Sequence, residues 1–195
     1  MRFLFLILIA LAIALGLGSY SAAWMIDHFE GTEIVVVGPW HADRTAGSPN
    51  ADPYAKARQA RSGNLTLGLG EGVAFRARVD SQNRELRREC TYQLEGAYPP
   101  ARIATLAAYD FEGRLIEAGN NRPNHLVSLH WMRNDRNEAI ISVGPVARPG
   151  NWLATVGDGG YILALTFYDT PVSTDSGAAP IAMPHIVRTD CQTNG

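Results

Sequence analysis

The chain opens with a long apolar segment that carries no charge, and this feature constrains the possible folds more than any other. Residues 3–26 read FLFLILIALAIALGLGSYSAAWMI. As a helix, these 24 residues extend about 36 Å, which exceeds a bilayer hydrocarbon core of about 30 Å. A core helix of a water-soluble domain would normally show a polar stripe, which this segment lacks. We therefore expect one transmembrane helix that holds the protein in a membrane through residues 3–26.

The residues that flank this segment predict its orientation. Arg2 and the terminal amino group precede it, whereas Asp27 and Glu30 follow it. Tyr20 and Trp24 stand near its far end, where amphipathic rings favour the lipid–water interface. The positive-inside rule keeps the N-terminus in the cytoplasm and sends the remainder across the membrane. In a Gram-negative cell, this predicts a single-pass inner-membrane protein with a periplasmic C-terminal domain.

A cleaved signal peptide is the alternative interpretation of the same segment. Residues 21–23 are small and offer a cleavage position, which would leave a mature N-terminus at Trp24. The apolar region of a signal peptide usually spans about 7–15 residues, and this one is longer. The length favours an uncleaved signal-anchor. Both interpretations export the rest of the chain.

The composition of the remainder excludes several classes of protein. Its 16 basic and 19 acidic residues give no cationic surface for nucleic acid, so no nucleic-acid partner is expected. Two cysteines are too few for a multi-cysteine zinc site. In an exported domain, where disulfides persist, we expect Cys90 and Cys191 to be joined. Two unrelated buried thiols remain the alternative.

Most of the exported part has the pattern of short strands. Residues 72–80 alternate apolar and polar side chains, as a half-buried antiparallel strand does. We expect further strands at residues 32–37, 90–94, 102–109, 125–131, 139–143, 161–168 and 181–188. Residues 41–51 and 173–180 are small, polar and loop-like, and 149–151 read as a turn. Many short strands with Gly/Pro punctuation predict a sandwich, jelly roll or barrel.

One short helix interrupts the strands. Asp52 is placed to cap it, Pro53 suits its first position, and Gly63 suits its end. Its basic residues lie in its C-terminal half, where the helix dipole favours them.

Six short motifs along the chain resemble one bacterial family. They are Asp52-Pro53-Tyr54-x-x-Ala57-Arg58, Asp80 within VDSQNREL, Tyr98-Pro99-Pro100-Ala101-Arg102, Ala108-Tyr109-Asp110-x-x-Gly113, Gly150-Asn151-Trp152-Leu153 and Leu165-x-x-Tyr168-x-x-Pro171. In this order they resemble the family called domain of unknown function 1214, over roughly residues 52–171. The sequence departs from the family pattern at Ala154, where proline is common, and at Thr166, where arginine is common.

The resemblance implies a fold but no reaction. It implies a mainly β protein, an antiparallel β-sandwich of jelly-roll type with one short helix, here preceded by a single N-terminal transmembrane helix. Relatives often occur beside, or fused to, a second uncharacterised domain, numbered 1254. We accordingly expect an anchor at residues 1–26, a linker with the first strand at 27–51, and the β-sandwich domain at 52–195.

The sequence contains no motif for a metal, a cofactor or a nucleophile. His125 and His130 are five apart on an expected strand, so they should point to opposite faces, unlike paired metal ligands. There is no HExxH or GxSxG pattern. We expect neither a metal nor a cofactor, and the catalytic residues, if any exist, are unknown.

Two groups of residues are ligand-binding candidates. Aromatic and polar residues that recur in the family motifs could line a carbohydrate groove: Arg102, Tyr109, Asp110, Asn151, Trp152 and Tyr168. Turn formation and core packing explain them equally well. The arginines of residues 76–88 could bind an anionic group, although a solvated face explains them too.

These observations favour a non-catalytic binding or assembly module of the cell envelope, with an envelope protein or glycan as partner. The alternative is a hydrolase or lyase that acts on an envelope glycan. Such an enzyme would need two carboxylates about 5–10 Å apart in an aromatic cleft.

Overall fold

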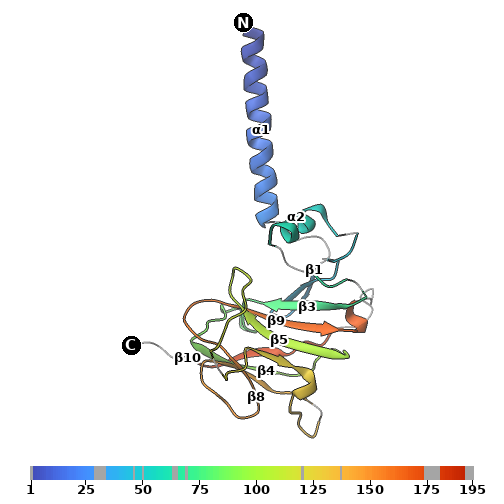
Figure 1. The fold of residues 1–195 in the computed structure, drawn as a ribbon, viewed down its shortest axis with the longest axis vertical. Coiled ribbons are helices and arrows are strands. Elements are labelled where there is room, and N and C mark those ends of the chain that lie inside the picture. Colours follow the sequence, from blue (N-terminus) through green and yellow to red (C-terminus); the bar gives the residue numbers. More distant parts are fainter. Residues whose placement is uncertain are drawn as a thin grey trace.

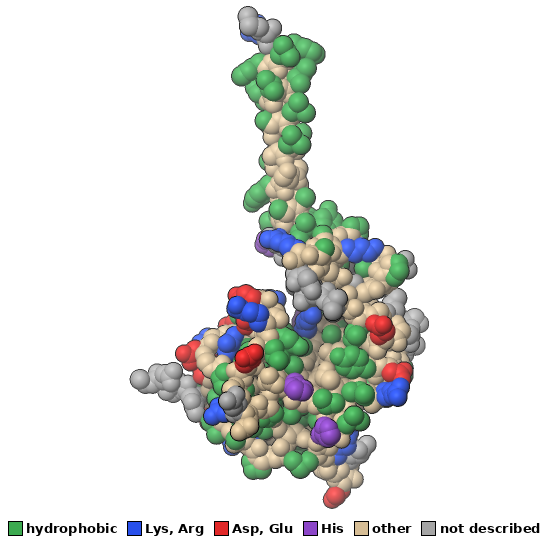
Figure 2. Space-filling model, viewed as in Figure 1, with side chains coloured by type: hydrophobic (Ala, Val, Ile, Leu, Met, Phe, Trp, Pro, Cys, Tyr) green, Lys and Arg blue, Asp and Glu red, His purple; other side chains and the backbone are tan. Residues whose placement is uncertain are grey.

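In the computed structural model, the apolar segment forms one long helix, α1 (Arg2–His28), which extends away from the rest of the protein (Figure 1). Its apolar side chains are exposed from Phe3 to Trp24, and Figure 2 shows them along the helix. The stretch Arg2–Ile26 is long and apolar enough to cross a membrane, and among the described residues no other helix is. The expected helix over residues 3–26 is confirmed and continues for two residues beyond that range.

The structure describes residues 2–28, 34–45, 47–49, 51–62, 66–68, 70–119, 121–136, 138–173 and 181–191. The expected helix end at Gly63, the start of the first strand at residue 32 and most of the loop at 173–180 lie outside these ranges.

The expected short helix is α2 (Pro53–Ser62), and it begins as the sequence predicts. The Asp52 carboxylate accepts a hydrogen bond from the Ala55 N–H at 3.3 Å, and its main-chain oxygen accepts one from Lys56 N–H at 3.0 Å. Asp52 therefore satisfies N–H groups that the first turn of a helix leaves without partners. The helix lies beside the C-terminal end of α1 (Figure 1).

Two sheets make up the β-rich part of the chain. The six-stranded sheet has the spatial order β1 (Ile34–Val37), β2 (Trp40–Asp43), β3 (Gly72–Ala77), β9 (Ile162–Tyr168), β5 (Ile103–Tyr109) and β6 (His125–Val127). The four-stranded sheet has the order β10 (His185–Cys191), β4 (Cys90–Glu95), β7 (Ile141–Gly144) and β8 (Asn151–Ala154). Two short 3-10 turns, η1 (Ser128–His130) and η2 (Pro171–Ser173), complete the fold. The mainly β class is confirmed.

The six-stranded sheet is organised around β9. Strands β3 and β5 both pair antiparallel with it, so they run parallel to each other and end at the same edge of the sheet. Alternate residues of β9 face the core, and Leu163, Leu165 and Phe167 are fully buried there. This is the period-two pattern that the sequence predicts.

The four-stranded sheet departs from the expected all-antiparallel arrangement. Strands β7 and β8 pair in parallel, with Ile141 opposite Asn151, although only residues 145–150 connect them. The sequence was interpreted as a turn at 149–151 because Pro149-Gly150 is a turn signal, yet Asn151 already belongs to β8. Strand β2 was likewise missed within the expected loop, since its four residues are too few for a recognisable alternation.

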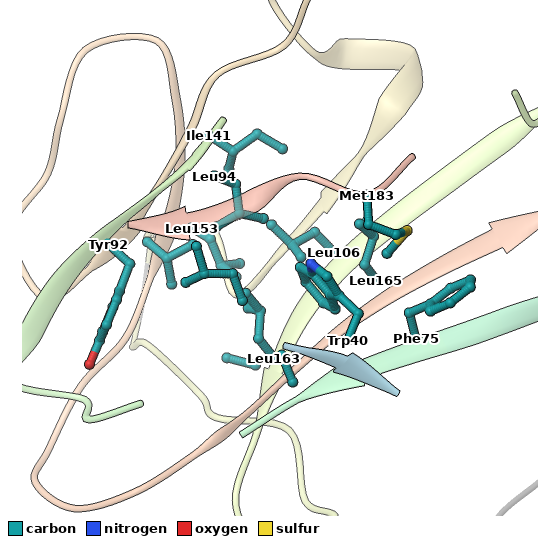
Figure 3. Packing of buried hydrophobic residues seen from close by; sticks show 14 of the residues in the cluster. Trp40, Phe75, Tyr92, Leu94, Leu106, Ile141, Leu153, Leu163, Leu165 and Met183 are labelled. Carbon is teal, nitrogen blue, oxygen red and sulfur yellow. The ribbon is translucent and has the colours of Figure 1, made fainter. Parts of the chain in front are cut away.

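The hydrophobic core lies between the two sheets and draws on both of them. Figure 3 shows Leu106, Leu163 and Leu165 of the six-stranded sheet pointing toward Leu94 and Leu153 of the four-stranded sheet. A fully buried aliphatic side chain contributes about 1.5–3 kcal/mol to folding, so this shared layer joins the two sheets.

One side of the core is closed by contacts of residues 184–188, in and just before β10, with β2 and with the loop between β3 and β4. The Trp40 indole donates a hydrogen bond to the Pro184 carbonyl at 2.7 Å. Ser81 and Ile186 exchange two bonds of 2.9 Å, one through the Ser81 hydroxyl. Arg188 reaches the Glu85 carbonyl at 2.7 Å. Strand β10 is thus held by both sheets.

The expected disulfide is present between Cys90 and Cys191, and no described cysteine is free. The two residues are register partners in the β4–β10 pair. The bond therefore attaches the last described residue of β10 to the start of β4, across 101 positions of sequence.

Removing this disulfide is expected to destabilise the protein. A loop of about 100 residues predicts a loss of about 2–5 kcal/mol in the Cys90→Ala/Cys191→Ala variant, because the unfolded chain gains freedom. Thermal unfolding with and without dithiothreitol measures this, and the variant should not respond to the reductant. Non-reducing peptide mapping should recover Cys90 linked to Cys191, and free thiols at both positions would contradict the assignment.

Candidate ligand-binding site

A hollow of about 350 Å³ lies on the side of the core opposite β10, where β6 and β8 meet. Both are edge strands of their sheets. A hydrogen bond of 2.8 Å from Ala154 N–H to the Pro123 carbonyl connects the two sheets there. The described residues that line the hollow are Pro123, His125, Leu126, Val127, His130, Trp131, Met132, Arg148, Gly150, Asn151 and Trp152.

The two histidines of the hollow correct an expectation from the sequence. His125 and His130 were expected on opposite faces of one strand, but both line the same hollow. Strand β6 ends at Val127, and the 3-10 turn η1 that follows places His130 on the same hollow as His125. The cause is Ser128, whose hydroxyl accepts a hydrogen bond from Ala104 N–H at 2.9 Å and so replaces the next main-chain partner of the ladder.

Asn151 holds the wall of the hollow in place. Its side-chain N–H groups donate to the carbonyls of Met132 (2.8 Å) and Ile140 (3.0 Å), and its Oδ1 accepts from Met132 N–H (2.7 Å). The side chain is buried, and these three bonds engage both ends of its amide. Asn151 therefore positions the segment that carries Met132.

Two tryptophans give the hollow its aromatic surface. Trp152 is half-buried, and its indole N–H donates to the Gly144 carbonyl at 3.0 Å, which fixes the ring orientation. Trp131 is buried against Tyr98, with ring centroids 5.3 Å apart. The Trp131 indole nitrogen is shielded from solvent, and no group of the described residues accepts a hydrogen bond from it.

Exposed aliphatic side chains lie near the lining residues of the hollow in sequence, and one of them, Met132, lines it. Leu129 and Met132 are 68% and 62% exposed, and Ile140 and Val146 are each nearly half exposed. Leu129 lies in η1, and the other three lie in the segments that follow η1 or flank β7. We call the four residues Leu129, Met132, Ile140 and Val146 the apolar rim.

The other predicted ligand-facing residues are not brought together. Tyr109 and Tyr168 alternate onto the outer face of the six-stranded sheet, but at opposite ends of the β5–β9 pair. Six residues of strand separate them, or about 20 Å. Arg102 is exposed beside Tyr168, to whose carbonyl its N–H donates at 3.1 Å. Their ligand role stays a prediction, and none of them is among the residues that line the hollow with Trp152.

Asp110 closes a hairpin turn. Its carboxylate accepts hydrogen bonds from the Arg114 N–H (2.8 Å) and from the Arg114 guanidinium (2.7 Å). Gly113 lies in the left-handed region, with φ of 82°, which the tight turn requires. Burial by itself would raise the pKa of Asp110, but the bonds from Arg114 hold that pKa below its ordinary value.

The same turn occurs a second time, at Asp80. Its carboxylate accepts from the Arg84 N–H (3.0 Å) and guanidinium (2.8 Å), and Asn83 takes the left-handed position with φ of 62°. Asp80 is the more deeply buried of the two, since its side chain is fully shielded, whereas that of Asp110 is 14% exposed. Burial favours a higher pKa for Asp80, yet the bonds from Arg84 and Gln82 lower it.

The two hairpins lie against each other at the start of β9. A side chain at Gly160 would collide with Glu85 of the first hairpin and with the ring of Phe111 of the second. The guanidinium of Arg78 lies over the Phe111 ring, 5.6 Å from its centre. A larger residue at position 160 would therefore require the Glu85 carboxylate and the Phe111 ring to move.

Three of the five arginines of residues 76–88 have side-chain partners within the protein. Arg84 pairs with Asp80, and Arg87 pairs with Glu89. These ion pairs and the contact between Arg78 and Phe111 favour the interpretation of a solvated, internally paired surface over an anion site.

Chemistry in the hollow is limited by its residue types. Its described lining contains two imidazoles and one guanidinium but no carboxylate, so it does not supply the acid pair that a glycan hydrolase needs. Among the described residues, no group of three or more His, Cys, Asp or Glu side chains is placed to hold a metal ion.

Sequence reasoning missed most of the hollow. His130 and Trp131 were not selected because residues 125–131 were interpreted as one continuous strand, and Met132 and Arg148 belong to none of the six motifs. The signal that could have found them is Ser128, a residue that often ends regular pairing by bonding to the main chain.

Comparisons with known proteins agree with the fold. The model of a family described as "Protein of unknown function (DUF1214)" matches residues 71–172. No curated protein matches the chain. The VPA0106 protein from Vibrio parahaemolyticus is similar in structure, with a TM-score of 0.62 and 14% identity. The likeness covers 91% of this chain but 44% of that one, so this chain spans less than half its length.

A second solved structure is more distant. An uncharacterised protein from Burkholderia cenocepacia has a TM-score of 0.43 and 19% identity, over 64% of this chain and 31% of that chain.

The hairpins closed by Asp80 and Asp110 predict a measurable difference in stability. At pH 7, Asp80→Asn should lower the free energy of unfolding by about 1–3 kcal/mol, because it removes a buried, charge-assisted network. Asp110→Asn should cost less, since the Arg114 guanidinium is largely exposed. Urea unfolding of both variants measures this difference, and equal losses would contradict it.

The pH dependence follows from the lowered pKa of Asp80. The contribution of the Asp80 carboxylate to the free energy of unfolding is fully present above the ordinary carboxyl pKa of about 4. It is lost as the pH falls through the lower pKa of the folded state. The gap in stability between the native protein and Asp80→Asn should therefore shrink below about pH 4.

Proposed function

The chain belongs to the DUF1214 family of proteins of unknown function, and we propose that it is a membrane-anchored assembly module of the cell envelope. The observation that carries this proposal is the hollow between β6 and β8 with its nearby apolar rim. In this proposal α1 remains in the inner membrane with its N-terminus in the cytoplasm, and the β-rich part lies in the periplasm. The disulfide supports the exported location, because such bonds persist in oxidising compartments.

We propose a division of the chain that follows its contacts. Residues 1–26 form the anchor, 27–51 a linking segment with the first strands, and 52–195 a β-sandwich of jelly-roll type. The linking segment is joined to the sheet by the single register pair His41 and Arg76. Trp40 is nevertheless buried in the core, so the linking segment is held firmly against the domain.

The partner that fits the hollow best is an apolar segment of another envelope protein. Exposed aliphatic side chains such as Leu129 and Met132 offer nothing to the hydroxyl groups of a sugar, whereas they gain from burial against apolar side chains. Trp152 and Arg148 are of the residue types that carry most of the energy in protein interfaces. The edge strands β6 and β8 also offer main-chain groups for pairing with an extended segment.

The alternative, a hydrolase or lyase of an envelope glycan, receives less support. The lining residues that the structure describes place no Asp or Glu beside Trp152, and the aromatic rings are fixed by internal contacts.

Crosslinking in native membranes tests whether the hollow and the apolar rim contact another envelope protein. With p-benzoylphenylalanine in place of Leu129, irradiation of the full chain should yield an adduct with a second protein. Adding Met132→Glu and Val146→Glu should reduce the adduct at least about fivefold, because charges cannot be buried in an apolar contact. The matched control pair is Val36→Glu and Val187→Glu, two apolar residues that are also exposed and lie on β1 and β10. An adduct with glycan alone, or equal loss with the control pair, contradicts the proposal.

The anchor is tested separately. The intact protein should resist extraction from membranes with alkaline carbonate and retain residues 1–26, because an uncharged helix of this length is stable in the bilayer. N-terminal sequencing checks this. A mature chain that begins at Trp24 would show a cleaved signal peptide instead.

A further inference from the structure

The short helix α2 lies at the level where the apolar part of α1 ends. The guanidinium of Arg58 donates a hydrogen bond of 3.4 Å to the main-chain oxygen of Ile26, the last residue of the stretch that could span a membrane. That stretch of 25 residues extends about 37 Å as a helix, a few ångströms more than the hydrocarbon core. Ile26 therefore falls in the headgroup layer, and Arg58 falls there with it.

The charge of α2 suits this position. Its sequence, PYAKARQARS, contains three basic residues and no acidic one. Tyr54, Arg58 and Arg61 have the spacing i, i+4 and i+7, so they share one face of the helix. Figure 2 shows basic side chains gathered at the foot of the apolar helix.

Aromatic side chains also lie near the C-terminal end of the apolar part of α1. Trp24 is half exposed on the last part of α1, and its ring stacks on that of His28 with 4.8 Å between centroids. Tryptophan and tyrosine favour the membrane interface, where one part of the ring is apolar and the other polar. Tyr54 adds a second such ring on the basic face of α2.

We propose that α2 lies on the membrane surface and that Arg58 and Arg61 bind the phosphate groups of anionic lipids in the leaflet that faces the β-rich domain. A guanidinium has five N–H donors in a planar fork, so Arg58 bonds the Ile26 oxygen and a phosphate at the same time. The helix thereby sets the distance and tilt of the domain relative to the bilayer. This inference rests on the proposed membrane anchoring of α1.

Hydrogen exchange of the full chain in lipid nanodiscs tests the proposal. A basic residue near an anionic surface contributes about fivefold to binding, so two contribute on the order of 25-fold. Amides of α2 should exchange several-fold more slowly in discs with 30% phosphatidylglycerol than in pure phosphatidylcholine. High salt should remove this difference, because it screens the attraction.

Variants separate lipid binding from a purely structural role. Arg58→Gln/Arg61→Gln should abolish the effect of phosphatidylglycerol, whereas Arg58→Lys/Arg61→Lys should keep most of it. The matched control Arg114→Gln/Arg136→Gln removes the same charge from largely exposed side chains of the domain and should leave the effect intact. If the Lys variant loses protection as fully as the Gln variant does, the arginines are structural and the proposal is wrong.

The remaining outcomes distinguish this inference from the anchor itself. If the chain inserts into both kinds of disc but α2 exchanges equally in them, the lipid contact is refuted while the anchor stands. If carbonate extracts the chain, both proposals fail. If 10 mM inorganic phosphate protects α2 in phosphatidylcholine discs as well as phosphatidylglycerol does, the site binds free phosphate and the lipid assignment is wrong.

Discussion

Burial of one face of each sheet against the other is the constraint on which the rest of this structure depends. Strand β9 lies within the larger sheet and contributes three fully buried side chains, Leu163, Leu165 and Phe167. Each is worth about 1.5–3 kcal/mol when removed from water. The sheets have six and four strands and share one core, and different contacts connect them at its two sides.

The two sides of the core have different roles. On the side of β10, the hydrogen bonds of Trp40 and Arg188 and the Ser81–Ile186 pair connect the two sheets, and the disulfide attaches β10 to β4 within the smaller sheet. On the other side, β6 and β8 leave a hollow, and Asn151 shapes its wall. The strongly bonded side supports stability, and the hollow side is the surface that we propose contacts a partner. The buried hairpin at Asp80 belongs to the first side, since Arg188 reaches the same hairpin.

Local sequence patterns predicted the features whose cause is local. The apolar run, the Asp52 cap and the alternation of residues 72–77 depend on neighbouring residues, and all three are found in the structure. The shared pattern of the hairpins at Asp80 and Asp110, Asp-x-x-Asn/Gly-Arg, is also local. Strand β8 was missed because its pairing with β7 is parallel, and nothing in four residues reveals their partner. The hollow was missed because Ser128 ends β6 through a bond to Ala104, a residue 24 positions away.

The sequence by itself determined that this chain has one exposed apolar helix and a β-rich body, because hydrophobic length and period are properties of contiguous residues. It also supplied two cysteines with no competitor for pairing. Only the tertiary structure decided that Cys90 faces Cys191, that His125 and His130 share a hollow, and that Arg58 meets the end of α1. These relations depend on which strands and helices become neighbours, and the free energy of the whole core, rather than any local motif, selects that arrangement.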